Sequence, residues 1–338
     1  MIFPWQEAAW GKLQTSPPTH HAWLLSGASG IGKWAFANAI AKARLCLQPV
    51  ENRQTGHACG ECIACKLHAT HAHPDFLTLT PEALRIELGL PEPVVEKDRK
   101  PSKEIRVDDV REVVQAFTRT THLGRGRVCI VYPAERMNTA SANTLLKTLE
   151  EPPVMPGGVL FIVVAHEPQQ LLPTVRSRCQ AMRAPQPSRE AALTWLVEKG
   201  VDKATAAASL AMSGNRPLAV VQSGGAVPAA LEFVAAVARK QWASAAKFDG
   251  KNLGNPVAVE ALMRWIADVA SVKAGANASS ARYFPALGKE CADWARATGW
   301  SALRAMQTHL TDAARIGNHP VISALFIEAL LVRLHPTP

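Results

Sequence analysis

The chain has 338 residues, 48% of them hydrophobic and 19% charged, which is enough apolar material for the core of a globular protein. Its length allows about two or three domains. The formal net charge of +9 and the pI near 9.4 suit a protein that works close to DNA or RNA phosphates. No apolar stretch reaches the roughly 18 residues of a membrane-spanning helix, and the first residues lack the basic start and apolar core of a signal peptide. We therefore expect a cytoplasmic protein without a membrane partner.

A glycine-rich run follows the first apolar segment. Residues 22–25 predict a buried strand and residues 33–47 predict a helix. The run between them has the spacing of a phosphate loop, with these residues: Gly27, Gly30, Gly32 and Lys33. In such loops backbone N–H groups and the lysine bind phosphate oxygens, and the next residue gives a hydroxyl to Mg²⁺. That residue is Trp34 here, whose indole cannot ligate a metal. The sequence predicts phosphate-loop ancestry and leaves open whether nucleotide still binds.

Four of the seven cysteines are close in the sequence, at Cys46, Cys59, Cys62 and Cys65. Because a cytosolic compartment keeps thiols reduced, this spacing indicates a metal site rather than disulfides. Four thiolates close a tetrahedral Zn²⁺ shell and leave no position for water, which predicts a structural zinc site. An iron–sulfur cluster is the alternative, although the fourth Cys followed by Pro that ferredoxin runs have is missing after Cys65.

Strands and helices alternate up to residue 184. Continuous apolar runs predict strands at 75–79, 128–131 and 160–164, and helical spacing predicts helices at about 110–117, 139–150 and 171–178. This alternation predicts an α/β domain over residues 1–184, with a parallel sheet covered by helices on both faces and the cysteine module 46–65 inserted.

After Ala184 the strand-like runs disappear and alanine-rich helical periodicity follows. Residues 188–222 predict about three short helices, and the pair Gly224-Gly225 marks a second boundary. Longer amphipathic helices are expected beyond it, near 229–247, 256–274, 283–297, 299–316 and 320–335. We therefore predict two further all-α domains, over residues 185–225 and 226–338.

Two segments carry a resemblance to a known family. Residues 134–153, with Asn-Thr-Leu-Leu-Lys-Thr-Leu-Glu-Glu-Pro-Pro at 143–153, and residues 172–179 resemble the AAA+ clamp loader family of bacterial DNA polymerase III. The run His73-Pro74-Asp75 and the four cysteines extend the resemblance over residues 20–180. The C-terminal half matches only in its helical character. The resemblance implies an AAA+ (RecA-like) domain, then a three-helix lid and a helical collar that holds subunits together.

The resemblance also implies roles for single residues. Tyr132 and Pro133 stand where ATP-binding members of the family have a metal-binding Asp and a catalytic Glu, so both acids are missing. Ser177, Arg178 and Cys179 match a Ser-Arg-Cys motif whose arginine reaches the ATP of the neighbouring subunit as an arginine finger. Arg216 matches the position of a nucleotide-sensing arginine, and the sequence leaves its role here open.

The function implied by the resemblance is that of a non-catalytic subunit within the DNA polymerase III holoenzyme, not an enzyme by itself. The implied partners are gamma/tau and delta subunits in a hetero-pentameric ring, the sliding clamp and primed-template DNA, with ATP in neighbouring subunits. One alternative is an ATP-hydrolysing, gamma/tau-like subunit that uses Lys33 for turnover, which the missing acids disfavour. The other is a zinc-dependent nucleic-acid-binding module, which is disfavoured because Lys66 is the one basic residue around Cys59–Cys65.

Overall fold

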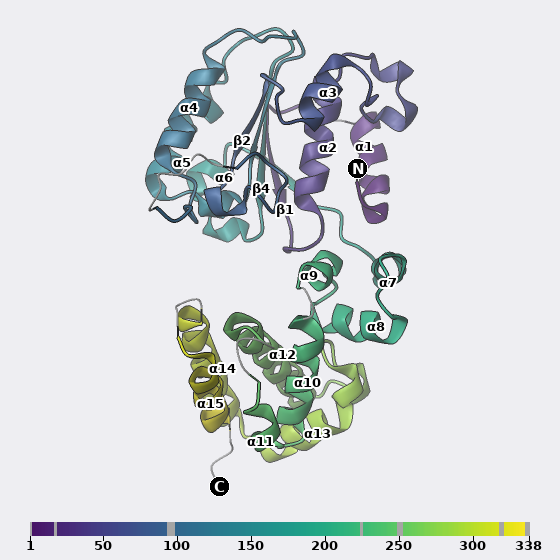
Figure 1. The fold of residues 1–338 in the computed structure, drawn as a ribbon, viewed down its shortest axis with the longest axis vertical. Helices are drawn as coiled ribbons and strands as arrows, with labels where there is room; N and C mark the ends of the chain where they lie inside the picture. The colour runs from purple at the N-terminus through teal and green to yellow at the C-terminus, as the bar shows by residue number, and fades with distance from the viewer. Residues whose placement is uncertain are drawn as a thin grey trace. The chain divides into compact units, whose positions relative to one another are not determined.

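The chain folds into two compact units, residues 1–186 and 187–338 (Figure 1). The computed structural model describes residues 2–16, 19–92, 99–223, 226–248, 253–317 and 321–334. Within these ranges the first unit holds the β-sheet and the second unit is helical. None of the helices in the described ranges is long and apolar enough to cross a membrane.

The strands of the first unit form one parallel sheet of five strands. They are β1 (Ala22–Ser26), β2 (Phe76–Leu79), β3 (Arg127–Val131), β4 (Val159–Ala165) and β5 (Gln180–Arg183), in the order β2-β3-β4-β1-β5. All residues of β3 and β4 are buried, as expected for parallel strands that are covered on both faces. The predicted α/β class, a parallel sheet with flanking helices that is followed by a helical part, is confirmed.

Helices cover both faces of this sheet (Figure 1). One face is covered by α4 (Val107–Phe117), α5 (Thr139–Glu150) and α6 (Pro173–Arg176), and the other by α1 (Glu7–Thr15), α2 (Lys33–Leu45) and α3 (Ile63–Ala69). Successive strand residues point to opposite faces, so Phe161 joins the core under α4 and α5 while Ile162 joins the core under α1 and α2.

Three elements of the first unit, α1, α3 and β5, were not expected from the sequence. The residues of β5 read Gln-Ala-Met-Arg and are mostly exposed, because β5 is an edge strand that pairs with β1 alone. It therefore lacks the apolar run that marked the central strands. The expected helix over 171–178 is shorter, since Pro173 starts α6 and the chain leaves it at Arg176 to enter β5.

A buried ion pair fixes the loop before β3. Asp75 is fully buried at the start of β2 and accepts hydrogen bonds from the backbone N–H groups of His122 and Leu123 and from Arg127 Nη2, at 3.0–3.1 Å. Arg127 is also buried and donates to the carbonyl oxygens of Arg119 and Thr120. The backbone of the basic segment 119–127 is thus held to the sheet by hydrogen bonds to the buried side chains of Asp75 and Arg127.

The second unit contains α7 (Arg189–Glu198), α8 (Lys203–Met212), α9 (Pro217–Gln222), α10 (Ala226–Ala238), α11 (Trp242–Ala245), α12 (Asn255–Lys273), α13 (Gly288–Ala297), α14 (Trp300–Ile316) and α15 (Ser323–Leu334). The helix expected over 229–247 is two elements, because Lys240 has a φ of 58° and ends the helical path. Helix α13 begins at Gly288, after a 3-10 turn at Pro285–Leu287.

All six helices from α10 through α15 contribute to one apolar core, which contains Trp265, Leu262 and Phe233 and also includes Met212 from α8. The predicted boundary at Gly224-Gly225 and the expected end of the last helix at residue 335 lie outside the described residues. The division of this unit into a lid over 185–225 and a collar over 226–338 stays a prediction.

Candidate functional site

The predicted phosphate loop connects the carboxyl end of β1 to the first turn of α2. Gly30 and Gly32 have φ values of 74° and 88°, a left-handed conformation that glycine adopts without strain. Lys33 is buried, and its Nζ donates to the carbonyl oxygens of Gly27 and Ala28 at 2.6 and 2.5 Å. The loop therefore has the strand–loop–helix geometry of the motif, with its lysine bonded to the loop's own backbone.

The N-terminal segment packs against this loop. Gln6 Nε2 donates to the carbonyl oxygens of Gly32 and Ile31 at 2.9 and 3.3 Å, and the Trp5 indole N–H donates to Ile31 at 2.9 Å. The ring of Phe3 lies so close to Gly32 that a Cβ there would approach it to 2.4 Å. Sequence reasoning missed these contacts because they join residues 25 to 29 positions apart, and no local pattern marks such a pairing.

An aromatic cluster occupies the sheet edge beside the loop. Parallel strands bring their carboxyl ends to one edge, so Tyr132 after β3 and His166 after β4 lie near the loop after β1. The Trp34 and Tyr132 ring centroids are 5.4 Å apart, as are those of Tyr132 and His166. Burial raises the pKa of Tyr132 to about 12, with Glu135 adding to the effect. A neutral indole and a neutral phenol thus stand at the two positions where an active phosphate-loop ATPase would have metal-binding oxygen atoms.

Arg178 lies just after α6 and is partly exposed. Its Nη1 donates to the carbonyl oxygen of Thr174 at 2.8 Å, and its Nη2 forms an ion pair with Glu150 at the end of α5. Ser177 Oγ also donates to Thr174, at 3.1 Å, and burial raises the pKa of the Cys179 thiol to about 11. The Ser-Arg-Cys segment is therefore held by α5 and α6. The ion pair with Glu150 had no signal in the sequence.

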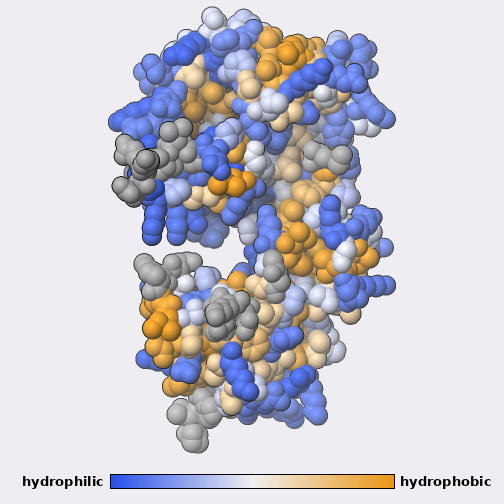
Figure 2. All heavy atoms as spheres, viewed as in Figure 1, coloured by the Kyte–Doolittle hydropathy of each residue, from blue (hydrophilic) through white to orange (hydrophobic). Residues whose placement is uncertain are grey.

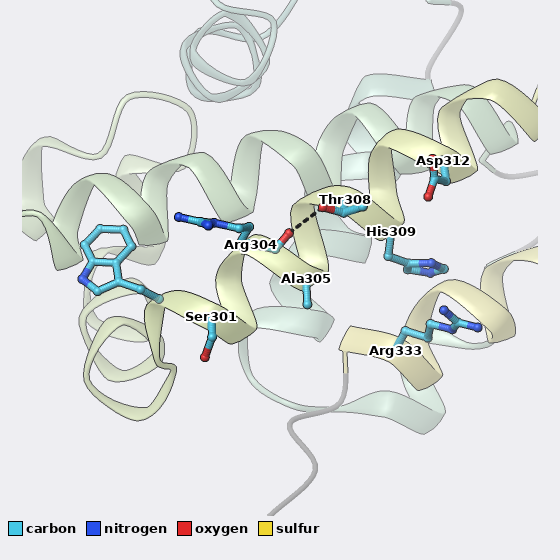
Figure 3. A pocket seen from close by; sticks show the side chains of 8 residues that line it. Ser301, Arg304, Ala305, Thr308, His309, Asp312 and Arg333 are labelled. Atoms are coloured by element: carbon cyan, nitrogen blue, oxygen red, sulfur yellow. Dashed lines mark hydrogen bonds between the residues drawn. The ribbon is translucent and has the colours of Figure 1, made fainter.

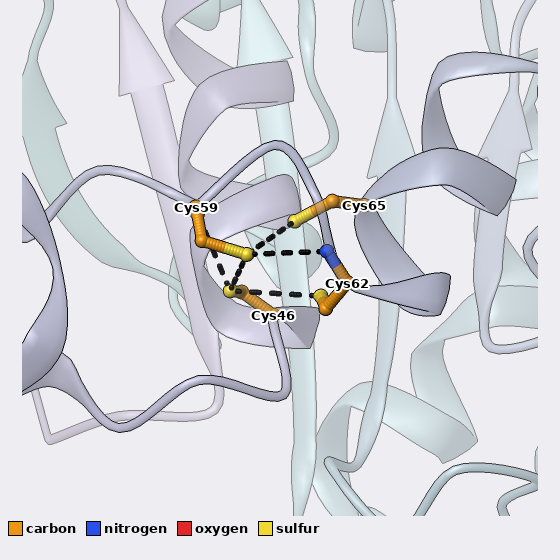
Figure 4. Close-up of side chains that lie close together, drawn as sticks. All are labelled: Cys46, Cys59, Cys62 and Cys65. Atoms are coloured by element: carbon orange, nitrogen blue, oxygen red, sulfur yellow. Dashed lines mark hydrogen bonds between the residues drawn. The ribbon is translucent and has the colours of Figure 1, made fainter.

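The structure brings the four predicted metal ligands together, although they come from the end of α2, the following loop and the start of α3 (Figure 4). The Sγ atoms of Cys46 are 3.6 Å from Cys59 and 3.9 Å from Cys62, and those of Cys59 and Cys65 are 3.9 Å apart. A tetrahedral ion with Zn–S bonds of about 2.3 Å requires S···S separations of about 3.8 Å. The four thiols can therefore hold a metal ion with little rearrangement.

The surroundings of the cluster favour a thiolate at one position. Burial opposes ionisation of Cys62, but backbone hydrogen bonds from Leu47 and Cys65 outweigh it and lower its pKa to about 6. Burial raises the pKa of Cys65 to about 12. Backbone N–H groups of Cys59 and Cys62 also point at sulfur atoms, at 3.5 and 3.4 Å. Such donors stabilise metal-bound thiolates.

Arg216 belongs to the second unit. It stands at the start of α9, where its Nε donates to the carbonyl oxygen of Ser213 at 2.5 Å and its Nη2 pairs with Glu260 of α12 at 3.0 Å. Arg264 pairs with the same carboxylate. Arg216 is thus part of a helix-joining ion-pair group within this unit.

A family model and the curated relatives of this chain identify one family. A family model described as DNA polymerase III, delta subunit, matches residues 6–188. A DNA polymerase III subunit delta′ from Pseudomonas aeruginosa is 40% identical over 219 residues, which cover 64% of this chain and 60% of that protein. The subunit delta′ of Escherichia coli is 34% identical over 220 residues, covering 64% and 58%. The chain thus spans about 60% of the length of the curated relatives it matches. Among solved structures, a DNA polymerase III gamma-subunit-related protein from Thermotoga maritima aligns over 97% of this chain and 98% of that one, with 14% identity and a TM-score of 0.38.

Proposed function

The chain belongs to the DNA polymerase III delta-subunit family, and from this membership we propose that it is a delta-prime subunit of a clamp loader. In this role it is a non-catalytic member of a cytoplasmic hetero-pentameric ring with gamma/tau and delta subunits, which loads the sliding clamp onto primed DNA. The observation that carries the proposal is the aromatic cluster at the phosphate loop. Trp34 and Tyr132 pack ring to ring where an ATPase of this family needs a hydroxyl and a carboxylate.

The loop itself is proposed as an inherited scaffold rather than a site of turnover. A metal ion that bridges ATP phosphates needs oxygen ligands from the protein, and Trp34 offers none. The competing function, an ATP-hydrolysing gamma/tau-like subunit, is tested by the purified chain alone. We expect no hydrolysis above the rate of a Lys33→Ala variant. Hydrolysis at an ordinary ATPase rate of about 1 s⁻¹ or more that is lost in Lys33→Ala would overturn the proposal.

Arg178 is proposed to act as an arginine finger on ATP in the adjoining subunit. It is partly exposed near the end of α6, and a guanidinium needs no catalytic group of its own chain to stabilise charge on a γ-phosphate. In this role the Arg178 guanidinium leaves the Glu150 carboxylate and forms charge-assisted hydrogen bonds to the phosphate oxygens of ATP, which carries more negative charge than one carboxylate. Ser177 and Cys179 shape the turn that presents it.

The finger is tested in the assembled ring with ATP-binding partners. Arg178→Ala should lower DNA- and clamp-stimulated turnover at the adjoining site by about 10³-fold or more. Arg176→Ala, which removes an exposed arginine two positions earlier in α6, is the matched control and should keep the normal rate. Unchanged hydrolysis in Arg178→Ala, with the ring intact by gel filtration, would remove the finger.

The cysteine cluster is proposed to hold a structural Zn²⁺. Its support is the four-sulfur donor set and the S···S separations of 3.6–3.9 Å. Elemental analysis of the purified chain should find about one zinc per molecule, lost in Cys62→Ser and kept in Cys291→Ser, which changes a buried thiol of the second unit. Iron with visible charge-transfer absorbance would assign an iron–sulfur cluster instead.

The second unit is proposed to supply the lid and the collar. Exposed apolar side chains gather on α14, on α15 and just before α15, where Figure 2 shows an orange patch: Ile316, Val321, Ile322, Leu325 and Val332. Beside them, a groove of about 600 Å³ runs between α14 and α15 with Arg304, His309 and Arg333 along it (Figure 3). An apolar patch with a charged rim suits helix packing between subunits. Arg216, held by Glu260, is proposed to stabilise this unit rather than to sense nucleotide.

A further inference from the structure

A cavity of about 580 Å³ lies in the first unit at the edge of the sheet opposite the phosphate loop. The loop follows the carboxyl end of β1, whereas the cavity is lined at the amino ends of β1 and β4 and by the last turns of α1 and α2. Its volume falls within the range of small-molecule sites, about 300–1,000 Å³. No role proposed above uses it.

The lining of this cavity is strongly basic. It contains Arg44, Arg53 and Arg125 with His20 and His21, and the lining has no carboxylate. None of the three guanidinium groups has an ion pair among the described residues. Arg53 is buried, and its guanidinium donates to the carbonyl oxygens of Ala43, Cys46 and Gln48, with no carboxylate paired to it in the described part of the chain.

Two arginines line the cavity close enough for their charges to interact. Arg44, near the end of α2, donates from Nη2 to the carbonyl oxygen of Gly157 at 2.6 Å, and the charge of Arg125 acts on it directly. The loops that carry Arg125 and Gly157 are packed so tightly that a Cβ on Gly126 would lie 2.4 Å from the Gly157 carbonyl oxygen. Like charges held together without a carboxylate form a site that an anion stabilises.

The walls behind these charges are apolar and aromatic, with Trp10, Trp23, Leu13 and Ile40. Arginine binds phosphate oxygens in its planar fork, and a small set of polar groups on an apolar wall is typical of sites for organic ligands. We propose that this cavity binds the phosphate group of a nucleotide-sized organic phosphate, with Arg44 and Arg125 as its ligands. The proposal is independent of the clamp loader function.

Calorimetric titration of the full chain tests the site, with inorganic pyrophosphate and ADP as probes. We expect saturable binding that weakens at least about tenfold in Arg125→Met, since a charge-assisted hydrogen bond contributes about 1.5–3 kcal/mol. The Arg125 side chain has no hydrogen bond or ion pair to the residues that the structure describes, so this variant should fold normally. A circular-dichroism melt checks this, and Arg44→Gln gives a second, independent loss.

Arg119→Met is the matched control, because it removes the same charge from the same basic segment outside the cavity. It should bind as the wild type does, and an equal loss in this variant would show non-specific attraction and overturn the proposal. Lys33→Ala removes the lysine of the phosphate loop, and the part of the binding that depends on Arg125 should persist in this variant. Loss of binding in Lys33→Ala with retention in Arg125→Met would place the anion at the phosphate loop and reject the site.

A second arm separates a free ligand from a DNA end. Competition by a 5′-phosphorylated oligonucleotide, but not by the same oligonucleotide without its phosphate, would support the phosphate site and assign DNA as its source. If neither oligonucleotide competes, and if ADP binds and Arg125→Met weakens the binding of ADP, the ligand is a free organic phosphate. No saturable binding of either probe by the wild-type chain overturns the proposal.

Discussion

At the residue scale, the first unit contains a buried ion pair, between Asp75 and Arg127. The pKa of Asp75 lies below its usual value although burial acts to raise it, because backbone N–H groups of His122 and Leu123 and the Arg127 guanidinium bind the carboxylate. Asp75→Asn leaves Arg127 buried without a counter-charge. We expect this change to lower the free energy of unfolding by about 3–5 kcal/mol, measured by urea denaturation.

Asp108→Asn provides the comparison for that measurement. Asp108 also pairs with an arginine, Arg111 at 2.9 Å, but both side chains are about two-thirds exposed, at 65% and 66%. An exposed pair of this kind contributes about 0–1 kcal/mol. If the two variants lost the same stability, burial of Asp75 would not be the reason for its effect.

A second residue-scale prediction concerns acid. Arg99 holds the pKa of Glu82 down to about 2, with help from the Ser102 N–H and Arg106, against an unperturbed value of 4.5. The folded-state pKa is depressed, so the stabilising contribution is complete above pH 4.5 and is lost as the pH falls from 4.5 to about 2. Unfolding free energies across this range should fall with acid in the wild type. The fall should be smaller in Glu82→Gln, and identical pH slopes would contradict the assignment.

At the element scale, the N-terminal segment and the phosphate loop act as one structure. Gly32 needs its φ of 88°, and the Phe3 ring occupies the space of a Cβ. Gly32→Ala should therefore cost about 1–3 kcal/mol of stability. Gly11→Ala in α1 is the control with the opposite sign, because no atom lies within 4 Å of its Cβ position and a helical Gly→Ala change stabilises by about 1 kcal/mol. Thermal melts of both variants check this, and destabilisation by both would refute the local explanation.

The cysteine module should respond to metal removal as a separate element. Its ligands lie on the end of α2, the loop after it and the start of α3, so an ion bound by all four would join these three segments. After chelation, hydrogen exchange should rise in residues 47–69 and stay slow in β3 and β4. Faster exchange throughout the sheet would instead mean that the metal supports the whole unit.

Sequence reasoning reached those features that local pattern encodes. Apolar runs located β3 and β4, glycine spacing located the phosphate loop, and Cys spacing located the cluster. It failed where structure depends on distant partners. The exposed strand β5 forms because it pairs with β1. The phosphate loop is covered by Gln6 through a contact between residues that are 26 positions apart. The pairing of Arg178 with Glu150 likewise joins residues 28 positions apart. The cavity beside Arg125 is lined by α1, α2, the starts of β1 and β4 and the loops before them, which lie far apart in the sequence.

At the scale of the whole molecule, the two units have separate apolar cores. Leu145 is fully buried in the core under α4 and α5, and Leu262 is fully buried in the core of the second unit. The same Leu→Ala substitution can therefore be made in the core of each unit. Leu→Ala changes at such positions cost about 2–5 kcal/mol, so each variant should destabilise the unit that contains it.

Scanning calorimetry of the full chain, with limited proteolysis to identify the unit that opens, distinguishes independent from joint unfolding. We expect two transitions, of which Leu145→Ala lowers one and Leu262→Ala lowers the other, because each unit buries its own core and only one chain connection, at residues 186–187, joins them in sequence. For a ring subunit this independence would let the second unit hold its neighbours while the first moves. A single transition that both variants lower equally would show one cooperative body and exclude such motion by separate units.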